Sequence, residues 1–455
     1  MLFTELTLSP ALARGLVDVE YVEMTPVQAA TLPTILAGGD VVAQAHTGSG
    51  KTAAFALGLL AALDTARLSL QGLVLCPTRE LADQVSREIR RLARAIPNIK
   101  VLTLCGGVPL RPQLASLAHE PHIVVGTPGR VLELLEKNVL PLAAVKVLVL
   151  DEADRMLDMG FSDALDSIVA ALPATRQTLL FSATIPDPIR AISRRLQRKP
   201  LDVSIEDTQA RPQIEQLFFE VDAKQKPSAL RALLLEYRPE SAVVFCNTRQ
   251  DVRAVAADLA ERGFSVLALH GELDQREREE MLVRFANRSC SVLVASDVAA
   301  RGLDIAELAM VVNYDLAHDA DTHLHRVGRT GRAGRSGLAL SLCAACEAPR
   351  ALAIAAGQGG PLHWAPLPAG SGKPQPAPFV TLVVDAGRQD KLRPGDLLGA
   401  LTGSAGLAAG AIGKIDVFPT RTYVAIAREA AAQARSGLRS GKIKGRAFRV
   451  RDLAV

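Results

Sequence analysis

Short apolar runs alternate with longer amphipathic segments along the first two thirds of the chain. The runs are rich in Val and Leu, and the segments between them carry apolar residues at helical spacing. This alternation is typical of a parallel α/β sheet, whose strands are buried on both faces. The predicted strands of the first half are Asp40–Ala43, Gly72–Cys76, Val101–Cys105, His122–Val125, Val145–Leu150 and Thr178–Phe181.

A polar stretch at Glu206–Pro212 interrupts this pattern, which then starts again. The chain has 455 residues, which is too long for one ordinary domain. We therefore predict two tandem α/β domains of similar size, residues 1–207 and 208–356. The predicted strands of the second are Gln216–Val221, Ala242–Phe245, Ser265–Leu269, Ser291–Ala295, Met310–Val312 and Leu338–Leu342.

Residues 357–378 are dominated by Gly, Pro and Ala and predict a linker without a packed core. The single tryptophan, Trp364, lies in this linker and could pin it to a domain. Residues 379–455 then follow the order strand, helix, strand, strand, helix, strand. This order predicts a small ferredoxin-like βαββαβ domain, the architecture of RRM domains.

Charge is distributed unevenly along the chain. Residues 379–455 carry 13 Lys+Arg against 6 Asp+Glu, a net charge of +7. Because the whole chain carries +4, the first 378 residues carry −3. A basic segment on a near-neutral body indicates a polyanionic partner for that segment. The N-terminal sequence MLFTELTLSP lacks the basic start and apolar stretch of a signal peptide, so we expect a cytoplasmic protein.

The six cysteines are spread along the chain, and four of them lie in apolar, strand-like runs. Such positions are typical of reduced cysteines in the core of a cytosolic protein. Cys343 and Cys346 form a C-x-x-C, but no second Cys or His pair follows at zinc spacing. We favour burial or chance for this pair over a metal or redox role.

A Gly-rich loop, Ala45–Thr52, follows the first predicted strand and precedes an apolar helix. Its small residues would allow backbone N–H groups to surround phosphate oxygens, and the helix N-terminus adds its dipole. We expect Lys51 to reach the β- and γ-phosphates of a nucleotide and the Thr52 hydroxyl to bind Mg²⁺. The other candidates in the loop are Thr47, Gly48, Ser49 and Gly50.

Asp151 and Glu152 stand at the carboxyl end of another predicted strand. Carboxylates at such an edge of an open α/β sheet face the ligand crevice, although acidic residues at strand ends are also often simply solvated. We expect Asp151 to hold Mg²⁺, partly through water. Glu152 would orient and deprotonate the attacking water.

The segment His325–Arg332 contains three arginines. They could form a solvated basic face. We favour the alternative that Arg329 and Arg332 cross a cleft between the two domains and stabilise the charge that develops on the γ-phosphoryl group. Hydrolysis would then require the cleft to be closed.

Together these motifs resemble those of the DEAD-box RNA helicases, over about Leu2 to Ala356. The segment Thr25–Gln28 is similar to the adenine-reading Q motif, which implies that Thr25 and Gln28 bind the adenine, with Tyr21 and Phe3 as packing partners. The resemblance also implies that Ser182 and Thr184 couple ATP to strand separation, and that Asp304 meets the ribose. Two residues depart from the family pattern: Glu20 replaces a glycine, and His46 stands in the phosphate loop.

Segments that resemble the family's RNA-contacting motifs are also present. Their hydroxyls, backbone N–H groups and single arginines suit phosphate and sugar contacts, which carry little sequence information. The candidates are Pro77, Thr78, Arg79, Gly106, Gly107, Thr127, Pro128, Gly129 and Arg130 in the first domain, and Arg249, Gln275 and Arg278 in the second, with Asn247, Thr248, Ser296 and Asp297 in the same segments.

The last segment resembles the RNA-binding domain of the DbpA subfamily, which implies recognition of a 23S ribosomal RNA hairpin and of pre-50S particles. It departs from an ordinary RRM because Thr381–Val384 has no aromatic residue and the third strand offers only Tyr423. Basic loops must therefore contribute more than base stacking. If Lys442, Lys444 and Arg446 lie in extended backbone, their side chains share one face and form a cationic strip.

We therefore expect a monomeric enzyme with ATP and Mg²⁺ as cofactors, in which RNA-stimulated ATP hydrolysis drives local duplex unwinding in assembly of the large ribosomal subunit. An ATP-gated RNA clamp that does not unwind is one alternative. A DNA translocase is a second, and it predicts equal stimulation by DNA and RNA.

Overall fold

The computed structural model describes residues 1–46, 48–205, 214–300, 308–331, 337–358 and 360–453. Apart from residues 301–307, the chain divides into two compact units, Met1–Ala210 and the residues from Arg211 onward. The predicted border after residue 207 and the polar stretch around it lie outside the described residues.

The first unit is built on a parallel sheet of seven strands in the order β3-β4-β2-β5-β6-β1-β7. All six predicted strands are confirmed with shifts of one or two residues at their ends. The seventh, β7, was not predicted. The strands are β1 (Val41–Gln44), β2 (Gly72–Leu75), β3 (Val101–Leu104), β4 (Ile123–Gly126), β5 (Val147–Asp151), β6 (Gln177–Ser182) and β7 (Leu201–Ser204).

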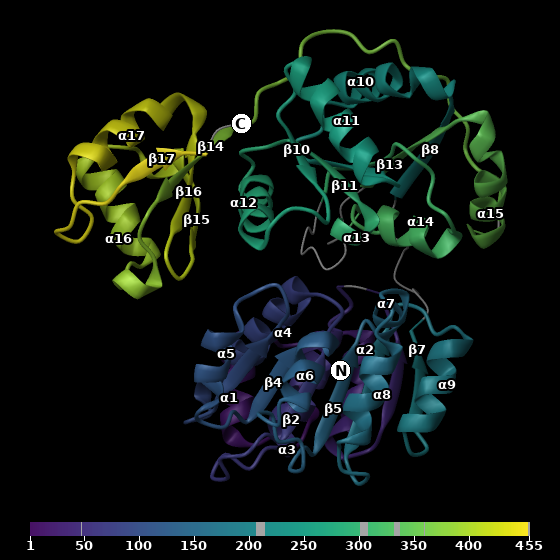
Figure 1. Cartoon of the computed structure of the whole chain (residues 1–455), viewed down its shortest axis with the longest axis vertical. Helices are drawn as coiled ribbons and strands as arrows, with labels where there is room; N and C mark the ends of the chain where they lie inside the picture. Colours follow the sequence, from purple (N-terminus) through teal and green to yellow (C-terminus); the bar gives the residue numbers. More distant parts are fainter. Residues whose placement is uncertain (47, 206–213, 301–307, 332–336, 359, 454–455) are drawn as a thin grey trace. The chain divides into compact units, whose positions relative to one another are not determined.

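Helices cover both faces of this sheet (Figure 1). One face packs against α1 (Pro10–Asp18), α2 (Pro26–Leu36), α3 (Lys51–Ala62) and α4 (Arg79–Leu92). The other packs against α5 (Leu110–Leu117), α6 (Pro128–Glu136), α7 (Ala153–Asp158), α8 (Ser162–Ala170) and α9 (Asp187–Leu196). Because both faces are covered, strand residues of either orientation are buried, which explains the continuous apolar runs of the sequence.

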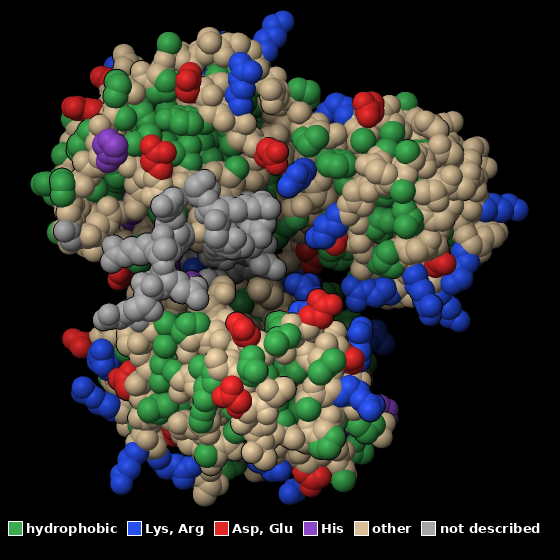
Figure 2. Space-filling view, turned by 180° about the vertical axis from the view of Figure 1, so that it is seen from behind, with side chains coloured by type: hydrophobic (Ala, Val, Ile, Leu, Met, Phe, Trp, Pro, Cys, Tyr) green, Lys and Arg blue, Asp and Glu red, His purple; other side chains and the backbone are tan. Residues whose placement is uncertain are grey.

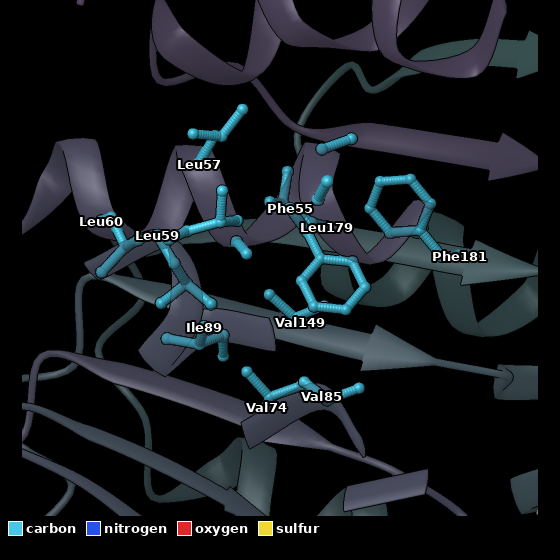
Figure 3. Packing of buried hydrophobic residues seen from close by; sticks show 14 of the residues in the cluster. Phe55, Leu57, Leu59, Leu60, Val74, Val85, Ile89, Val149, Leu179 and Phe181 are labelled. Carbon is cyan, nitrogen blue, oxygen red and sulfur yellow. The ribbon is translucent and has the colours of Figure 1, made fainter. Parts of the chain in front are cut away.

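The phosphate-loop helix α3 is anchored in the core by aromatic packing (Figure 3). The Phe55 ring lies 5.4 Å from the Phe181 ring of β6, centroid to centroid, with the planes tilted by 54°. Both side chains are fully buried. This contact fixes the start of α3 against the sheet, and therefore fixes the loop that precedes it.

The second unit begins with a six-stranded parallel sheet in the order β10-β11-β9-β12-β13-β8, and all six predicted strands are confirmed. The strands are β8 (Ile214–Glu220), β9 (Ala242–Cys246), β10 (Val266–Leu269), β11 (Val292–Ser296), β12 (Met310–Asn313) and β13 (Gly337–Cys343). The helices are α10 (Lys226–Tyr237), α11 (Arg249–Glu261), α12 (Gln275–Ala286), α13 (Asp297–Ala300), α14 (Ala320–Val327) and α15 (Ala348–Gln358).

The predicted linker runs along this domain and touches it. The backbone N–H of Phe218 donates to the His363 carbonyl at 2.8 Å, and the Ala365 N–H donates to the Phe218 carbonyl at 2.9 Å. The Trp364 ring lies 5.8 Å from the Phe218 ring. Because β8 is an edge strand of its sheet, the linker occupies edge hydrogen-bonding groups that would otherwise be exposed.

The C-terminal part of the second unit has the predicted βαββαβ order and a four-stranded antiparallel sheet, β15-β16-β14-β17. Its elements are β14 (Phe379–Val384), α16 (Pro394–Gly399) continued by a π-helical segment (Ala400–Ser404), β15 (Ile412–Val417), β16 (Thr422–Ala427), α17 (Ala431–Ser440) and β17 (Val450–Asp452). The fold class is therefore confirmed: two parallel-sheet domains followed by a small α+β domain.

One face of this small sheet packs on α16 and α17, and the other face lies against α12 (Figure 1). Val383 and Tyr423 pack against Val283 of α12. The Thr381 hydroxyl bonds to Ser289 at 2.8 Å and accepts a hydrogen bond from the Asn287 amide at 2.9 Å. The Tyr423 side chain is therefore buried, and it is not exposed for base stacking.

Among the helices that the structure describes, none is long and apolar enough to cross a membrane.

Candidate nucleotide and RNA site

The phosphate loop joins β1 to α3 and depends on glycine at two positions. Gly48 and Gly50 have φ values of +91° and +93°, in the left-handed region that favours glycine. A Cβ on Gly50 would lie 2.5 Å from Nε2 of Gln28 and 2.8 Å from Oγ1 of Thr25. The loop can therefore approach the start of α2 this closely only with glycine at position 50.

Gln28 and Thr25 are held against the loop by hydrogen bonds. The Gln28 amide donates to the Gly50 carbonyl at 3.1 Å, and its oxygen accepts from the Thr25 backbone N–H at 2.9 Å. The second bond belongs to a capping box at the start of α2. Both predicted adenine-binding residues are thus fixed beside the phosphate loop.

The Tyr21 ring is held by residues from two other elements. It stacks on Phe3, with centroids 6.1 Å apart and planes at 16°, and the Arg91 guanidinium lies 5.6 Å from its centroid. The hydroxyl donates to Glu88 at 2.8 Å. Burial, followed by the bond to Glu88, raises the pKa of Tyr21 to about 12. Tyr21 and Phe3 were both predicted as packing partners at the adenine, whereas the contacts with Glu88 and Arg91 were not predicted.

Lys51 and Asp151 are buried side chains of opposite charge that interact electrostatically. Lys51 Nζ donates to the Ala45 carbonyl at 2.7 Å, and both charged side chains are buried. Burial raises the pKa of Asp151 to about 7 although the positive charge of Lys51 acts in the opposite direction. The carboxylate is therefore only partly compensated by the protein.

Glu152 has an unusual backbone conformation at the end of β5. Its φ and ψ are 53° and 52°, a left-handed conformation that strains a residue with a side chain and that occurs often at functional sites. Its carboxylate accepts a hydrogen bond from the Arg155 guanidinium at 3.0 Å, and both side chains are buried. The strained turn and this ion pair fix the direction of the carboxylate.

Ser182 and Thr184 both contact Asp154, the last acidic residue of the segment Asp151–Asp154. The Asp154 backbone N–H donates to the Ser182 hydroxyl at 3.2 Å. The Asp154 carboxylate accepts from the Thr184 N–H at 3.0 Å and from its hydroxyl at 2.9 Å. The predicted coupling residues are thus bonded directly to the segment that carries Glu152.

Strand order places the ATP and RNA candidates at one end of the same sheet. The phosphate loop, the acidic segment and the coupling residue Thr184 follow β1, β5 and β6, which are neighbours in the sheet. The first-domain RNA candidates follow β2, β3 and β4, which form the other half. Since the carboxyl ends of parallel strands meet at the same edge, the two groups lie side by side along it.

The RNA candidates of this edge support one another. The Gly106 N–H donates to the Thr127 hydroxyl at 3.3 Å, and Arg130 donates to the Val108 carbonyl at 3.0 Å. Thr78 caps α4 by accepting from the Leu81 N–H at 3.3 Å. The loops after β2, β3 and β4 are thus held in fixed conformations.

In the second unit, Arg326 is buried and binds several partners. It makes two hydrogen bonds of 2.7 Å to the Asp297 carboxylate and one of 2.8 Å to the Asn247 side chain. Its guanidinium also lies 5.1 Å from the Phe245 ring centroid. Asn247 and Asp297 therefore hold Arg326, which belongs to α14. Arg329 follows the end of α14 and is also buried.

Comparison with known proteins decides the family. The family model for DEAD/DEAH box helicase matches residues 25–192, that for helicase conserved C-terminal domain matches 225–334, and that for DbpA RNA binding domain matches 381–452. The chain is 56% identical to the ATP-dependent RNA helicase DbpA of Escherichia coli (strain K12) over 447 residues, 98% of each chain. The chain belongs to the DbpA subfamily of DEAD-box ATP-dependent RNA helicases.

Two further relatives agree with this assignment. The DEAD-box ATP-dependent RNA helicase CshA of Bacillus cereus is 44% identical over 328 residues, 72% of this chain and 62% of that protein. A structure of S. cerevisiae Dbp5 bound to RNA and ADP BeF3 has a TM-score of 0.72 at 30% identity, covering 80% of this chain and 95% of that one.

Three of the DEAD-box residues predicted from the sequence, Thr47, Asp304 and Arg332, lie outside the described residues. Of the described RNA candidates in the second helicase domain, Arg249 forms an ion pair with Glu272 at 2.6 Å, and Gln275 donates to Glu279 at 3.4 Å. Arg278 donates to the Ala299 carbonyl at 2.8 Å.

The predicted cationic strip of the C-terminal domain needs a correction. Residues 442–446 do not form an extended strand, because Ile443 and Arg446 exchange two backbone hydrogen bonds across a tight turn. Lys444 and Gly445 have φ values of +53° and +77° in that turn. Lys444 lies 3.6 Å from Asp396, and Arg446 lies 3.7 Å from Asp390. The three basic side chains therefore share a loop of this DEAD-box protein, and not one face of a strand.

Sequence reasoning did not single out Asp154, which is hydrogen-bonded to Ser182 and Thr184, or Arg326, which binds Asn247 and Asp297. The position of Asp154 in the acidic segment could have suggested its role. Arg326 lies in the same segment as Arg329 and Arg332, and the sequence offers no signal that separates its role from theirs. Within the described residues, no group of three His, Cys, Asp or Glu side chains could hold a metal ion, and Cys343 and Cys346 are free thiols.

Proposed function

We propose that this helicase hydrolyses ATP with Mg²⁺ to open short duplexes in 23S ribosomal RNA of pre-50S particles, acting as a cytoplasmic monomer. The observation that carries the choice of target is the C-terminal domain. It matches the DbpA RNA binding domain and buries one sheet face against α12, so that its basic loops remain to contact RNA. The identity of 56% with the E. coli helicase DbpA supports the same choice.

The residues near Asp151 fit a Mg²⁺ ion. Burial raises the pKa of this carboxyl to about 7, so an added cation would relieve an incompletely compensated charge. Mg²⁺ prefers oxygen ligands, and we infer that Asp151, partly through water, and the Thr52 hydroxyl would hold it. When bound, the ion would neutralise charge on the transferred phosphoryl group.

The side chains of this chain would then share the remaining work. Gln28 and Thr25 would bind the adenine with Tyr21 beside it, and Lys51 and the loop N–H groups would hold the phosphates. Glu152, fixed by Arg155, would orient the attacking water and accept its proton.

The arginines after α14 would supply the remaining positive charge at the phosphates. We propose that Arg329 and Arg332 stabilise the charge of the transition state, and that Asp304 binds the ribose. Replacing Arg332 with Ala should then slow hydrolysis strongly and leave ATP binding to the first domain unchanged. A loss confined to RNA affinity would make this arginine an RNA contact.

Base-independent contacts with the strand would come from the loops after β2, β3 and β4 together with Arg249, Gln275 and Arg278. Selection of the ribosomal hairpin would come from the loop that carries Lys442, Lys444 and Arg446. Lys444 and Arg446 also pair with acidic residues of the same domain, so RNA phosphates would compete with those carboxylates.

The test compares ATPase stimulation by a 23S hairpin fragment with that by an unrelated RNA of equal length. The triple variant Lys442→Ala, Lys444→Ala, Arg446→Ala should lose most of the preference. Its plot of log affinity against log salt should flatten by about 0.7–0.9 for each RNA phosphate that is no longer neutralised. The triple variant Arg14→Ala, Arg194→Ala, Arg262→Ala removes the same charge from exposed positions elsewhere and should keep the preference.

Three outcomes would contradict the proposal. If the triple variant of Lys442, Lys444 and Arg446 keeps the preference for the 23S hairpin, specificity resides in other residues. Stimulation by DNA as strong as by RNA would favour a DNA translocase. Hydrolysis without release of a short duplex would favour an RNA clamp.

A further inference from the structure

A cavity of about 480 Å³ lies where α12 meets the C-terminal domain, entirely within the second unit. It is lined by one residue of α12, Arg276, and by Asp385, Thr420, Arg421, Arg449 and Arg451 of the C-terminal domain. Four of its six lining residues are therefore arginines from three separate segments of the chain. Figure 2 shows Lys and Arg side chains gathered along this junction.

Three of these arginines share one carboxylate. Oε1 of Glu280 lies 3.3 Å from Arg276 Nε, 3.2 Å from Arg421 Nη1 and 3.8 Å from Arg451 Nη2. The Tyr423 hydroxyl also donates to this oxygen, at 3.3 Å. Because each guanidinium carries five N–H donors, one carboxylate oxygen leaves most of these donors without a charged acceptor.

The arginines of the cavity outnumber the carboxylates near it. Asp385, the other nearby carboxylate, lies 3.6 Å from Arg451 Nε. Arg449 is exposed and forms no ion pair with any residue that the structure describes. Four guanidinium groups against the carboxylates of Glu280 and Asp385 leave an excess of two positive charges, which matches one phosphate dianion or two phosphodiesters.

The walls of the cavity are held in place by the packing around them. Val283, Val383 and Tyr423 form an apolar cluster beside it. The Asn287 amide donates to Thr381 at 2.9 Å across the same junction. Arginines that are fixed in advance lose less conformational entropy when an anion binds, which increases affinity.

We propose that this cavity, which we name the arginine pocket, is a phosphate-binding site that takes the backbone of RNA already bound to the enzyme. Planar guanidinium groups bind phosphate oxygens with paired hydrogen bonds, and the Thr420 hydroxyl can donate one more. RNA seated here contacts the second helicase domain and the C-terminal domain at once. The inference rests on the proposed RNA helicase function and adds a contact that joins the two domains.

The test uses the full-length chain with Arg276→Ala and Arg449→Ala together. These two side chains are exposed, whereas Arg421 and Arg451 are more buried and help to hold the junction. Affinity for a labelled 23S hairpin RNA with a single-stranded extension is measured over a series of KCl concentrations. We expect about tenfold weaker binding at low salt and a slope lower by about 1–2. The double variant Arg14→Ala, Arg262→Ala is the charge-matched control and should retain the slope.

A second arm identifies the occupant. Calorimetry with inorganic pyrophosphate measures the same chemistry in a small anion. If the pocket variant loses pyrophosphate binding but keeps the RNA slope of the control, the occupant is a free phosphate compound and the RNA assignment is wrong. If neither measurement changes, the pocket binds no phosphate. The wild type's preference for the hairpin over unrelated RNA is recorded in parallel, so that failure of the proposed ribosomal target is seen separately from failure of the pocket.

Discussion

The carboxylate of Asp154 accepts two hydrogen bonds from Thr184, one from its backbone N–H at 3.0 Å and one from its hydroxyl at 2.9 Å. The two residues follow β5 and β6, which are paired in the sheet. Glu152 lies only two residues before Asp154. These hydrogen bonds therefore link the segment that carries Glu152 directly to the segment after β6.

Replacing Thr184 with Val should separate hydrolysis from unwinding. The change removes the hydroxyl bond to a carboxylate, a loss of about 1.5–3 kcal/mol, and leaves the backbone bond in place. We expect ATPase activity within about threefold of wild type and release of a short duplex slowed by about tenfold or more. Both rates are measured on the same RNA. Thr175→Val, at an exposed position, is the control. Equal losses of the two activities would contradict a coupling role.

Replacing Glu152 with Gln should stop hydrolysis without preventing binding. The amide keeps the shape and can still accept a bond from Arg155, but it cannot take a proton, so we expect a loss of about 10²–10⁴-fold in kcat. Binding of ATP and RNA is followed by fluorescence titration. The exposed Glu136→Gln variant should behave as wild type. Normal turnover by the Glu152 variant would remove this residue from its assigned role.

Replacing Gly50 with Ala should weaken ATP binding. The new Cβ would lie 2.5 Å from Gln28 Nε2, so Gln28 and Thr25, the proposed adenine-binding residues, must move away from the loop. Gly38→Ala is a matched control, because its φ of +82° imposes similar strain while its Cβ would meet no atom within 4 Å. We expect at least about tenfold weaker binding for Gly50→Ala alone, with thermal stability lowered in both variants by on the order of 1–2 kcal/mol. Similar ATP affinities for the two variants would show that strain alone matters.

The second helicase domain should lose stability in acid because of His323. Burial, and then the charge of Arg326, lowers the pKa of this histidine from 6.5 to about 4. Below pH 6.5 the unfolded chain takes up the proton while the folded chain does not, so stability falls as the pH drops towards 4. The loss amounts to about 3 kcal/mol when complete.

Calorimetric unfolding of the full chain at about pH 7.5 and about pH 5.0, on either side of the unfolded pKa, checks this. His323→Gln should show a smaller fall in Tm between the two pH values than wild type does. His318→Gln, at an exposed position, should follow wild type. An equal fall in all three proteins would exclude His323 as the source.

The sheets were predictable because their strands are buried on both faces and leave continuous apolar runs. The missed strand β7 shows the limit of this signal. It lies at the edge of its sheet, and three of its four residues are exposed. A half-exposed edge strand has no apolar run, so its pairing depends on the neighbouring strand β1.

Candidate residues for an ATP site could be named from the sequence because the phosphate loop and the acidic segment are local motifs. The tail could not be predicted in the same way. Tyr423 is buried by α12, which lies far earlier in the chain, and no local pattern reports that packing. The turn at Lys444 and Gly445 leaves no distinct signal either, because alternating charges are compatible with an extended strand as well as with a turn.

The attachment of the linker to the second helicase domain can be followed by intrinsic fluorescence. Trp364 is the only tryptophan of the chain, and its ring lies against Phe218 on the edge of the second helicase sheet. Indole fluorescence depends on the polarity around the ring. Detachment of this segment would therefore change the emission wavelength and intensity of the protein's intrinsic fluorescence. The protein therefore carries a natural spectroscopic reporter at the segment that joins the helicase core to its RNA-binding domain.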